Sequence, residues 1–153
     1  MSGAFGDLRD LYQEVILEHG RHPRHAGRPE TFDATARGDN PMCGDRVQVF
    51  LRYGPDGSIA RTSFEARGCA ISVASADLMA ETVQGRAPAE ARTLVSRFTE
   101  MARTGQCPDC DATMERLRPL AGVHEYPSRV KCATLPWHAL MAALDGGGQA
   151  SSE

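Results

Sequence analysis

A predicted β-hairpin constrains the fold of this chain more than any other feature. The sequence GPDG at residues 54–57 combines the residue types that tight turns require. From Asp45 up to this turn, polarity alternates as in a half-buried strand, with Val47, Val49, Leu51 and Tyr53 on one side. β-Branched and aromatic residues follow over residues 58–67, so the two segments predict an antiparallel pair. Residues 34–39 are a candidate third strand.

Helical patterns flank this hairpin on both sides. Hydrophobic residues repeat at helical spacing within residues 8–16, and the Pro- and Gly-containing residues 21–30 predict a surface loop. Downstream, four segments predict helices: one after Gly68, one from about Pro88, one around Met114 and one from about Cys132 to Leu144. The predicted fold class is therefore α+β, with a small, about three-stranded antiparallel sheet on which an N-terminal helix and a group of helices pack.

Particular residues predict where these helices begin and end. Gly20, Gly85 and Gly105 are expected stops, because glycine readily adopts the left-handed conformation that follows a helix. Pro88 suits a first helical turn, and Asp111 suits a helix N-cap. The clearest buried stripe comprises Ala91, Leu94, Val95, Phe98, Met101 and Ala102.

The length of the chain indicates a single domain. Its 153 residues are enough for one ordinary hydrophobic core and too few for two, so residues 1–145 are predicted to form one domain. Residues 146–153 (GGGQASSE) have no apolar surface to bury, and we expect this tail to be disordered.

Charge and hydropathy exclude two classes of partner. The 20 acidic and 17 basic residues are mixed along the chain, for a net charge of −3. Without a Lys/Arg-rich run, nothing in the sequence would neutralise a nucleic-acid backbone or an anionic membrane. No run of eighteen apolar residues and no signal-peptide pattern occurs. We therefore expect a cytoplasmic protein that binds neither nucleic acid nor membrane.

The five cysteines fall into two sets. Cys43, Cys69 and Cys132 stand alone, whereas Cys107 and Cys110 form a Cys-Pro-Asp-Cys pair. In a reducing compartment, cysteines bind metal or do chemistry more often than they form a disulfide framework, and an odd number cannot all pair within one chain.

The three isolated cysteines could meet Asp45 at one metal ion. Cys43 and Asp45 are two residues apart in an extended segment, so both side chains point the same way. Cys69 and Cys132 are predicted at helix N-termini, where the helix dipole lowers a thiol pKa. Three sulfurs and one oxygen would suit tetrahedral zinc. The alternative is that these cysteines are small buried hydrophobic residues, and their spacing alone does not decide.

Three separated motifs resemble the SufU branch of the IscU/NifU-N family of iron–sulfur cluster assembly proteins. They are NPMCGD (40–45), RGCAISVASADLM (67–79) and RVKCATLPWHAL (129–140), and the N-terminal LYQEVILEHGRHPRHAG is also similar. The resemblance runs from about Leu8 to Leu144 and implies a SufE/NifU-like fold. It also implies that Cys43, Asp45, Cys69 and Cys132 bind zinc or, alternatively, iron or an iron–sulfur cluster.

Two departures from the scaffold branch favour a sulfur-transfer role. Scaffold-type members have a histidine before the third motif cysteine and an apolar-proline chaperone motif upstream; Lys131 and EYPSRV stand there instead. The segment after Gly105 also resembles the insertion of SufU-like proteins. The resemblance thus implies a zinc-dependent sulfur acceptor, with Cys43 taking persulfide sulfur from a SufS-type cysteine desulfurase and a SufB/SufC/SufD-type complex as a further partner. A cluster scaffold and a zinc-stabilised binding module without chemistry remain alternatives.

Two further groups of residues have open interpretations. Lys131, Arg129 and Arg67 stand near the ligands in sequence and could offset the excess negative charge of the site, or could be solvated surface cations. Cys107 and Cys110 could form a reversible disulfide, share a second zinc across a dimer, or be exposed on a variable insertion.

Overall fold

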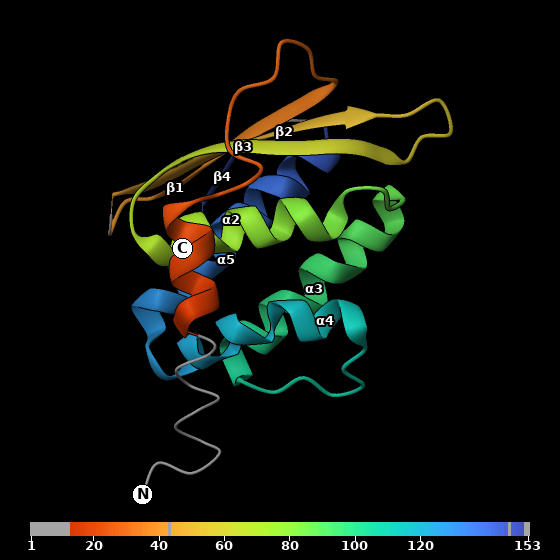
Figure 1. Ribbon diagram of the computed structural model, residues 1–153. Coiled ribbons are helices and arrows are strands. Elements are labelled where there is room, and N and C mark those ends of the chain that lie inside the picture. Colours follow the sequence, from red (N-terminus) through yellow and green to blue (C-terminus); the bar gives the residue numbers. More distant parts are fainter. Residues whose placement is uncertain (1–12, 43, 147, 152–153) are drawn as a thin grey trace, which may run out of the picture.

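The computed structural model of the chain describes residues 13–42, 44–146 and 148–151 (Figure 1). Residues 13–21 are helical, and the prediction for residues 8–12 lies outside the described part. The elements that follow are β1 (Ala34–Asn40), β2 (Asp45–Tyr53), β3 (Ile59–Arg67), α2 (Ala70–Val83), α3 (Pro88–Thr104), α4 (Ala112–Leu117), the 3-10 helix η1 (Arg118–Glu125), α5 (Pro127–Leu144) and β4 (Gly148–Ser151). The predicted α+β class is confirmed.

The predicted hairpin and third strand form the centre of the sheet. Strands β2 and β3 pair antiparallel, with Val49 opposite Phe64, and β1 pairs antiparallel with β2, with Ala36 opposite Val49. Odd-numbered β2 residues from Asp45 to Leu51 are buried on the face of the sheet that packs against the helices, as their alternation predicts. The other face of β2 begins with Arg46, which is exposed.

The C-terminal tail differs from its prediction. Residues 148–151 form β4, which pairs parallel with β1 at the edge of the sheet, in the order β3-β2-β1-β4. A strand of this kind is held by backbone hydrogen bonds, so it does not need the apolar side chains that the tail lacks. The backbone N–H and C=O groups at the edge of β1 pair with β4. The sequence pattern does not show that this edge is available.

The helices build two layers below the sheet, as Figure 1 shows. Helices α2 and α5 lie against the strands, and α3 packs on α5 from the far side. Trp137 of α5 stacks on Phe98 of α3, with ring centroids 4.5 Å apart, at the centre of this core. Every residue of the predicted α3 stripe is buried.

Helix α5 begins earlier than predicted. The pattern places its start near Cys132, but the helix starts at Pro127, where proline occupies the first turn. Proline suits that position because its missing N–H is not needed there. Cys132 therefore lies in the second turn of α5, not at its N-terminus.

The N-terminal helix is fixed against α2 by a close approach. Gly20 does not end the helix, which continues to Arg21. A Cβ on Gly20 would lie 3.1 Å from the carbonyl oxygen of Ala70, so a side chain here would crowd the first turn of α2.

A buried carboxylate anchors the loop that follows. Asp77 of α2 is fully buried, and its Oδ2 lies 2.6 Å from Nδ1 of His19. Its Oδ1 accepts hydrogen bonds from the backbone N–H groups of Arg24 and His25, each at 2.8 Å. The predicted surface loop is thus tied to the core at its start.

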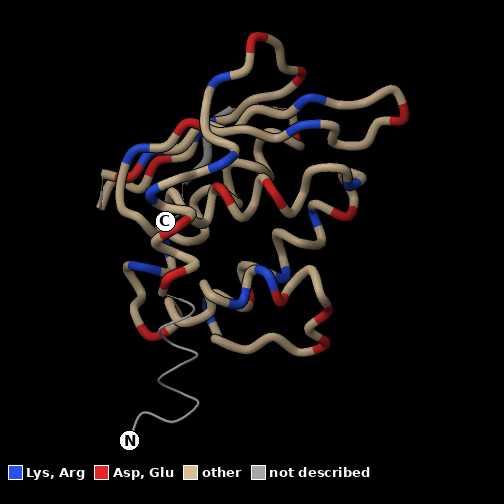
Figure 2. The backbone as a smooth tube through the Cα atoms, in the orientation of Figure 1, with Lys and Arg blue, Asp and Glu red and all other residues tan. Residues whose placement is uncertain are grey.

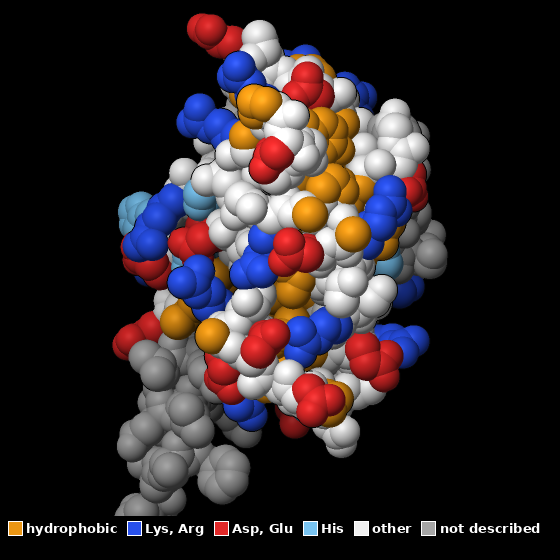
Figure 3. All heavy atoms as spheres, turned by 90° about the vertical axis from the view of Figure 1, so that its right-hand side faces the viewer, with side chains coloured by type: hydrophobic (Ala, Val, Ile, Leu, Met, Phe, Trp, Pro, Cys, Tyr) orange, Lys and Arg blue, Asp and Glu red, His pale blue; other side chains and the backbone are white. Residues whose placement is uncertain are grey.

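Charges of both signs are mixed over the surface, as the sequence predicts. In the face shown in Figure 3, acidic and basic side chains alternate, with hydrophobic side chains reaching the surface between them. None of the helices in the described ranges is long and apolar enough to cross a bilayer.

Candidate metal centre

Three predicted ligands from three distant segments meet at one point. Asp45 is the first residue of β2, Cys69 is the N-cap of α2, and Cys132 lies in the second turn of α5. One ligand atom from each lies within 4.8 Å of the others. Asp45 and Cys132 are buried, whereas Cys69 is partly exposed. The site is therefore open to solvent on the side of Cys69.

Hydrogen bonds hold the carboxylate in place between the two sulfurs. The backbone N–H of Cys69 donates to Oδ1 of Asp45 at 3.0 Å, and Cys69 Sγ lies 3.6 Å from Oδ2. The hydroxyl of Ser72 lies 2.9 Å from Asp45 Oδ2 and 3.0 Å from the carbonyl oxygen of Cys132. Ser72 thus joins the β2 ligand to the α5 ligand, as outer partners of metal ligands commonly do.

The surroundings lower the pKa of the Asp45 carboxyl and raise the pKa of the buried Cys132 thiol. Burial by itself would raise the pKa of Asp45, but hydrogen bonds from Cys132, the Cys69 N–H and Ser72 together lower it below its ordinary value. Burial, together with hydrogen bonding to Asp45, raises the pKa of Cys132 far above that of a free thiol. Cys132 therefore needs a nearby cation to ionise.

Of the two cysteines predicted at helix N-termini, Cys69 is the one that lies at such a position. As the N-cap of α2, Cys69 lies beside free backbone N–H groups, as predicted. The same prediction for Cys132 is wrong, because α5 begins five residues before it. A bound metal ion would supply the charge that the helix dipole does not.

Gly68 is required by the approach of β3 to Asp45. Its φ of +140° is a conformation that residues with a side chain rarely adopt. A Cβ at this position would overlap Oδ1 of Asp45 and lie 2.7 Å from its Cγ. The glycine therefore lets the chain turn from β3 into Cys69 while the carboxylate lies directly against its backbone.

The donor set fits zinc. Two thiols and one carboxylate are accepted zinc ligands, and three protein ligands leave one position of a tetrahedron for a fourth. The predicted fourth ligand, Cys43, lies outside the described residues. Its neighbour Gly44 has φ of +74° and donates its N–H to the carbonyl oxygen of Asn40 at 2.8 Å. A hollow of about 790 Å³ opens here, lined in part by Asn40, Gly44 and Asp45.

The three predicted basic residues differ in their relation to the site. Arg129, one turn before Cys132, is close enough that the charges of Cys69 and Cys132 raise the pKa of its guanidinium. Arg67 is exposed at the end of β3 and lines the hollow. The charged groups of Arg67 and Lys131 form no ion pair with a side chain of the described ranges.

Sequence reasoning did not identify two partners of the site and a buried amide. Ser72 lies three residues after Cys69, on the same face of α2, so helical spacing was the available signal. Gly68 precedes the motif cysteine, but only the path of β3 shows what it contacts. Asn40 is fully buried, and its amide has no hydrogen-bond partner among the described residues. That polar group borders the hollow beside Asp45.

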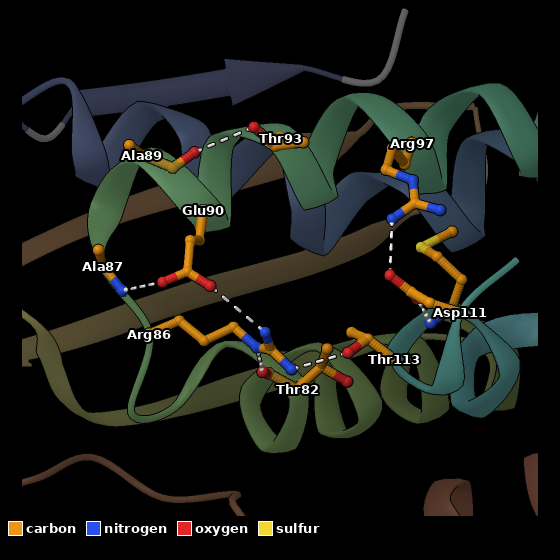
Figure 4. Close-up of polar contacts among 10 residues, drawn as sticks. Thr82, Arg86, Ala87, Ala89, Glu90, Thr93, Arg97, Asp111 and Thr113 are labelled. Carbon is orange, nitrogen blue, oxygen red and sulfur yellow. Dashed lines mark hydrogen bonds and ion pairs between the residues drawn. The ribbon is translucent and has the colours of Figure 1, made fainter. Parts of the chain in front are cut away.

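Cys107 and Cys110 form a disulfide on the loop between α3 and α4. Both are partly buried against the core. Arg97 of α3 holds the loop, because its guanidinium donates to the carbonyl oxygen of Asp109 at 2.9 Å and to Asp111 at 3.2 Å. Asp111 also caps α4, as predicted, through the N–H of Met114 (Figure 4). The described residues supply no third metal ligand to this pair.

Comparison with known proteins identifies the family. The model of the NifU-like N-terminal domain matches residues 11–133, which include all four predicted ligands. The chain belongs to the NifU-like N-terminal domain family. Its predicted relationship to IscU and SufU proteins of iron–sulfur cluster assembly is confirmed by the relatives below.

Individual members of the family have two different described roles. The chain is 35% identical to the iron–sulfur cluster assembly scaffold protein IscU of Streptococcus pyogenes serotype M1, over 92% of this chain and 87% of that protein. It is 34% identical to the zinc-dependent sulfurtransferase SufU of Bacillus subtilis (strain 168), over 92% and 96%. It also resembles a crystal structure from Fervidobacterium islandicum AW-1, assigned as a cluster assembly scaffold for the SUF system, with a TM-score of 0.79, 29% identity and 89% and 98% coverage.

Proposed function

We propose that this protein is a zinc-dependent sulfurtransferase that receives persulfide sulfur for iron–sulfur cluster assembly. The observation that carries the proposal is the convergence of Asp45, Cys69 and Cys132 within 4.8 Å, at a site that is open to solvent on the side of Cys69. A closed structural zinc site would have no need of an open side. The similarity to a zinc-dependent sulfurtransferase supports the same role.

The residues around the ion have distinct tasks. Asp45, Cys69 and Cys132 hold zinc, and Cys43 is the fourth ligand. Bound zinc supplies the positive charge that keeps buried thiols ionised at neutral pH, which for Cys132 opposes the effect of its surroundings on its pKa. Ser72 and the Cys69 N–H orient the carboxylate, and Arg129 offsets the negative charge of the thiolates.

Cys43 is the residue that accepts the sulfur. Its thiolate attacks the outer sulfur of a cysteine persulfide on the donor, so that a new sulfur–sulfur bond forms on Cys43. The sulfur–sulfur bond of the donor breaks at the same time, and the donor cysteine leaves as a thiolate. Gly44, which follows Cys43 in sequence, lines the hollow together with Asn40 and Arg67, and we expect the donor to approach from this side.

The proposed donor is a SufS-type cysteine desulfurase, which carries a persulfide on its own cysteine. A SufB/SufC/SufD-type complex would then receive the sulfur, in the cytoplasm. The basic residues Arg67 and Arg46 at the rim of the hollow would meet acidic groups on these partners.

An intact-mass experiment tests the role of Cys43. The zinc-loaded protein is incubated with a desulfurase and cysteine without added reductant, and its mass is measured. We expect a gain of one sulfur in the wild type and none in Cys43→Ser. The variant Cys107→Ser/Cys110→Ser is the matched control and should still gain sulfur. A gain that persists in Cys43→Ser would overturn the assignment.

The scaffold role is the second candidate, favoured by the 35% identity to a cluster assembly scaffold. The same four residues would then hold iron and sulfide. Metal analysis and absorption spectra of protein purified without oxygen distinguish the two roles. One zinc per chain and a colourless protein support sulfur transfer, whereas a stable brown, iron-loaded protein supports the scaffold.

A further inference from the structure

A second concave site lies on the face of the sheet that the helices leave uncovered. A partly open cavity of about 390 Å³ is bordered by residues 24–32 of the N-terminal loop and by parts of β2 and β3. Figure 1 shows this loop rising above the sheet, on the side away from the helices. The cavity volume falls within the range of small-molecule sites. The metal centre lies elsewhere, because Asp45 begins β2 on the helix-facing side.

Arginine is the dominant residue of this cavity, which we call the arginine pocket. Arg24 and Arg28 come from the loop, Arg52 from β2 and Arg61 from β3, while Glu30 is the acidic residue among its lining. Figure 2 shows basic positions in blue, with acidic ones in red, along the loop and the neighbouring strands. None of the four forms an ion pair with a residue of the described ranges. This clustering contrasts with the mixed charges of the rest of a chain whose net charge is −3.

The sheet register brings two of these charges face to face. Arg52 lies directly opposite Arg61 in the β2–β3 pair, next to the irregularity at Tyr53. Like charges at opposite positions of an antiparallel pair destabilise it. A bound anion would turn this repulsion into a favourable interaction, because guanidinium groups bind phosphate and carboxylate through paired hydrogen bonds.

A third arginine is held in position by aromatic rings. The guanidinium of Arg28 lies 5.5 Å from the ring centroid of Phe32 and 5.3 Å from that of Phe50. The two rings themselves pack at 5.1 Å. A surface arginine normally loses considerable side-chain entropy when it binds a ligand, and the ring contacts reduce that loss for Arg28.

The backbone of the pocket is also fixed at both ends of the loop. Its first residues are bound to the buried carboxylate of Asp77, and Gly27 donates its N–H to the carbonyl oxygen of Phe64 at 2.7 Å. At the other end, Asp33 donates its N–H to the carbonyl oxygen of Leu51 at 2.8 Å. The cavity is therefore a built site between two anchored segments.

We propose that the arginine pocket binds a small polyvalent anion, a molecule with at least two phosphate or carboxylate groups. Several arginines that converge on one cavity match several anionic groups better than one. The site is separate from the metal centre and does not depend on the sulfur-transfer proposal. Its ligand would be a metabolite or nucleotide of this charge class.

Calorimetric titration of the full zinc-loaded chain with fructose 1,6-bisphosphate tests the proposal. We expect a dissociation constant below about 1 mM, and binding at least about tenfold weaker for fructose 6-phosphate, which has one phosphate. The double variant Arg52→Gln/Arg61→Gln should weaken bisphosphate binding more than about tenfold. The control Arg103→Gln/Arg118→Gln removes the same charge from helix surfaces and should change it less than about twofold.

Amide chemical shifts locate the ligand and check the fold of each variant. Bisphosphate should shift the resonances of Gly27 and Ser63 and leave those of Gly44 and Cys69 in place. Equal affinity in both double variants, shifts confined to the metal centre, or no saturation by any of these sugars would overturn the proposal. Binding of a glutamate-rich peptide without binding of bisphosphate would also overturn it, in favour of an acidic protein partner.

Discussion

The two cysteine sets of this protein lie in different environments, one at a candidate metal centre and the other in a disulfide. Cys69 and Cys132 come from helices 63 residues apart in sequence and meet across the carboxylate of Asp45. Cys107 and Cys110 are neighbours on one loop and are joined to each other. Cys107 and Cys110, the local pair, have the spacing of a zinc half-site, yet Cys69 and Cys132, the dispersed pair, are the ones that lie beside a third candidate ligand, Asp45.

The difference lies in what surrounds each pair. At the dispersed pair, a buried carboxylate is held between the sulfurs by Ser72 and by a backbone N–H, so a third ligand is already in place. At the local pair, the described residues bring no third ligand to the two sulfurs, and Asp111 is occupied in capping α4 and in binding Arg97. The dispersed pair is therefore the better candidate for a metal site, because a third ligand is already in place there.

The test with the largest expected effect removes each of the two carboxylates in turn. We expect Asp45→Ala to lose its zinc and to lower sulfur transfer more than about 100-fold, because a metal ligand and its hydrogen bonds disappear together. Asp111→Ala is the matched control and should lower the melting temperature slightly as a lost N-cap, with zinc content unchanged. Metal analysis, thermal unfolding and the sulfur-transfer rate measure these effects. If Asp45→Ala still binds one zinc per chain, Asp45 is not the ligand that distinguishes the two cysteine pairs.

Gly68 tests whether the close approach to Asp45 matters beyond backbone conformation. Gly68→Ala should lower the free energy of unfolding by about 3 kcal/mol or more, because its Cβ would overlap the carboxylate as well as strain φ. Gly57 has φ of +84°, but a Cβ there would meet nothing within 4 Å. Gly57→Ala should therefore cost only about 1–2 kcal/mol and leave zinc affinity unchanged. If Gly68→Ala and Gly57→Ala lose equal stability and equal zinc affinity, backbone conformation alone would explain the need for glycine at residue 68.

Much of this arrangement could be predicted from local patterns. The alternation of β2, the GPDG turn and the stripe of α3 identify their elements, because each depends on neighbouring residues. The motif cysteines and Asp45 could likewise be chosen, since their surroundings resemble a family pattern. Cys43 stays a prediction, because it lies outside the described residues.

The features that sequence could not supply depend on contacts between distant segments. Strand β4 requires the free edge of β1, and Gly20 closely approaches Ala70, which is 50 residues away. The start of α5 was misplaced because its first turn, PSRVK, lacks the apolar spacing on which the prediction relied. Ser72 carried a local signal, but its partner on α5 could not be seen in the sequence.

The disulfide gives the next test, with a smaller expected effect. Cys107→Ser/Cys110→Ser should lower the free energy of unfolding by about 2 kcal/mol or less, because the loop that the disulfide closes is short. Zinc content and sulfur transfer should be unchanged. Denaturant unfolding in oxidised and reduced buffer measures the effect, and reduction should destabilise the wild type but not the variant. Loss of zinc from this variant would mean that the two cysteine sets are coupled.

The finest test separates a hydroxyl that supports the metal centre from one that supports only packing. Ser72→Ala should weaken zinc binding about tenfold and cost about 1 kcal/mol, since Asp45 loses a donor that orients it. Ser75, one turn later on α2, also bonds a backbone carbonyl of α5 and accepts from Trp137. Ser75→Ala should cost about 1–3 kcal/mol, because the Trp137 N–H is left buried without a partner, yet zinc affinity should not change. Competition with a zinc chelator measures both variants. If both variants weaken zinc binding equally, the contact between α2 and α5 supports the site as a whole. Ser72 would then have no particular role in positioning Asp45.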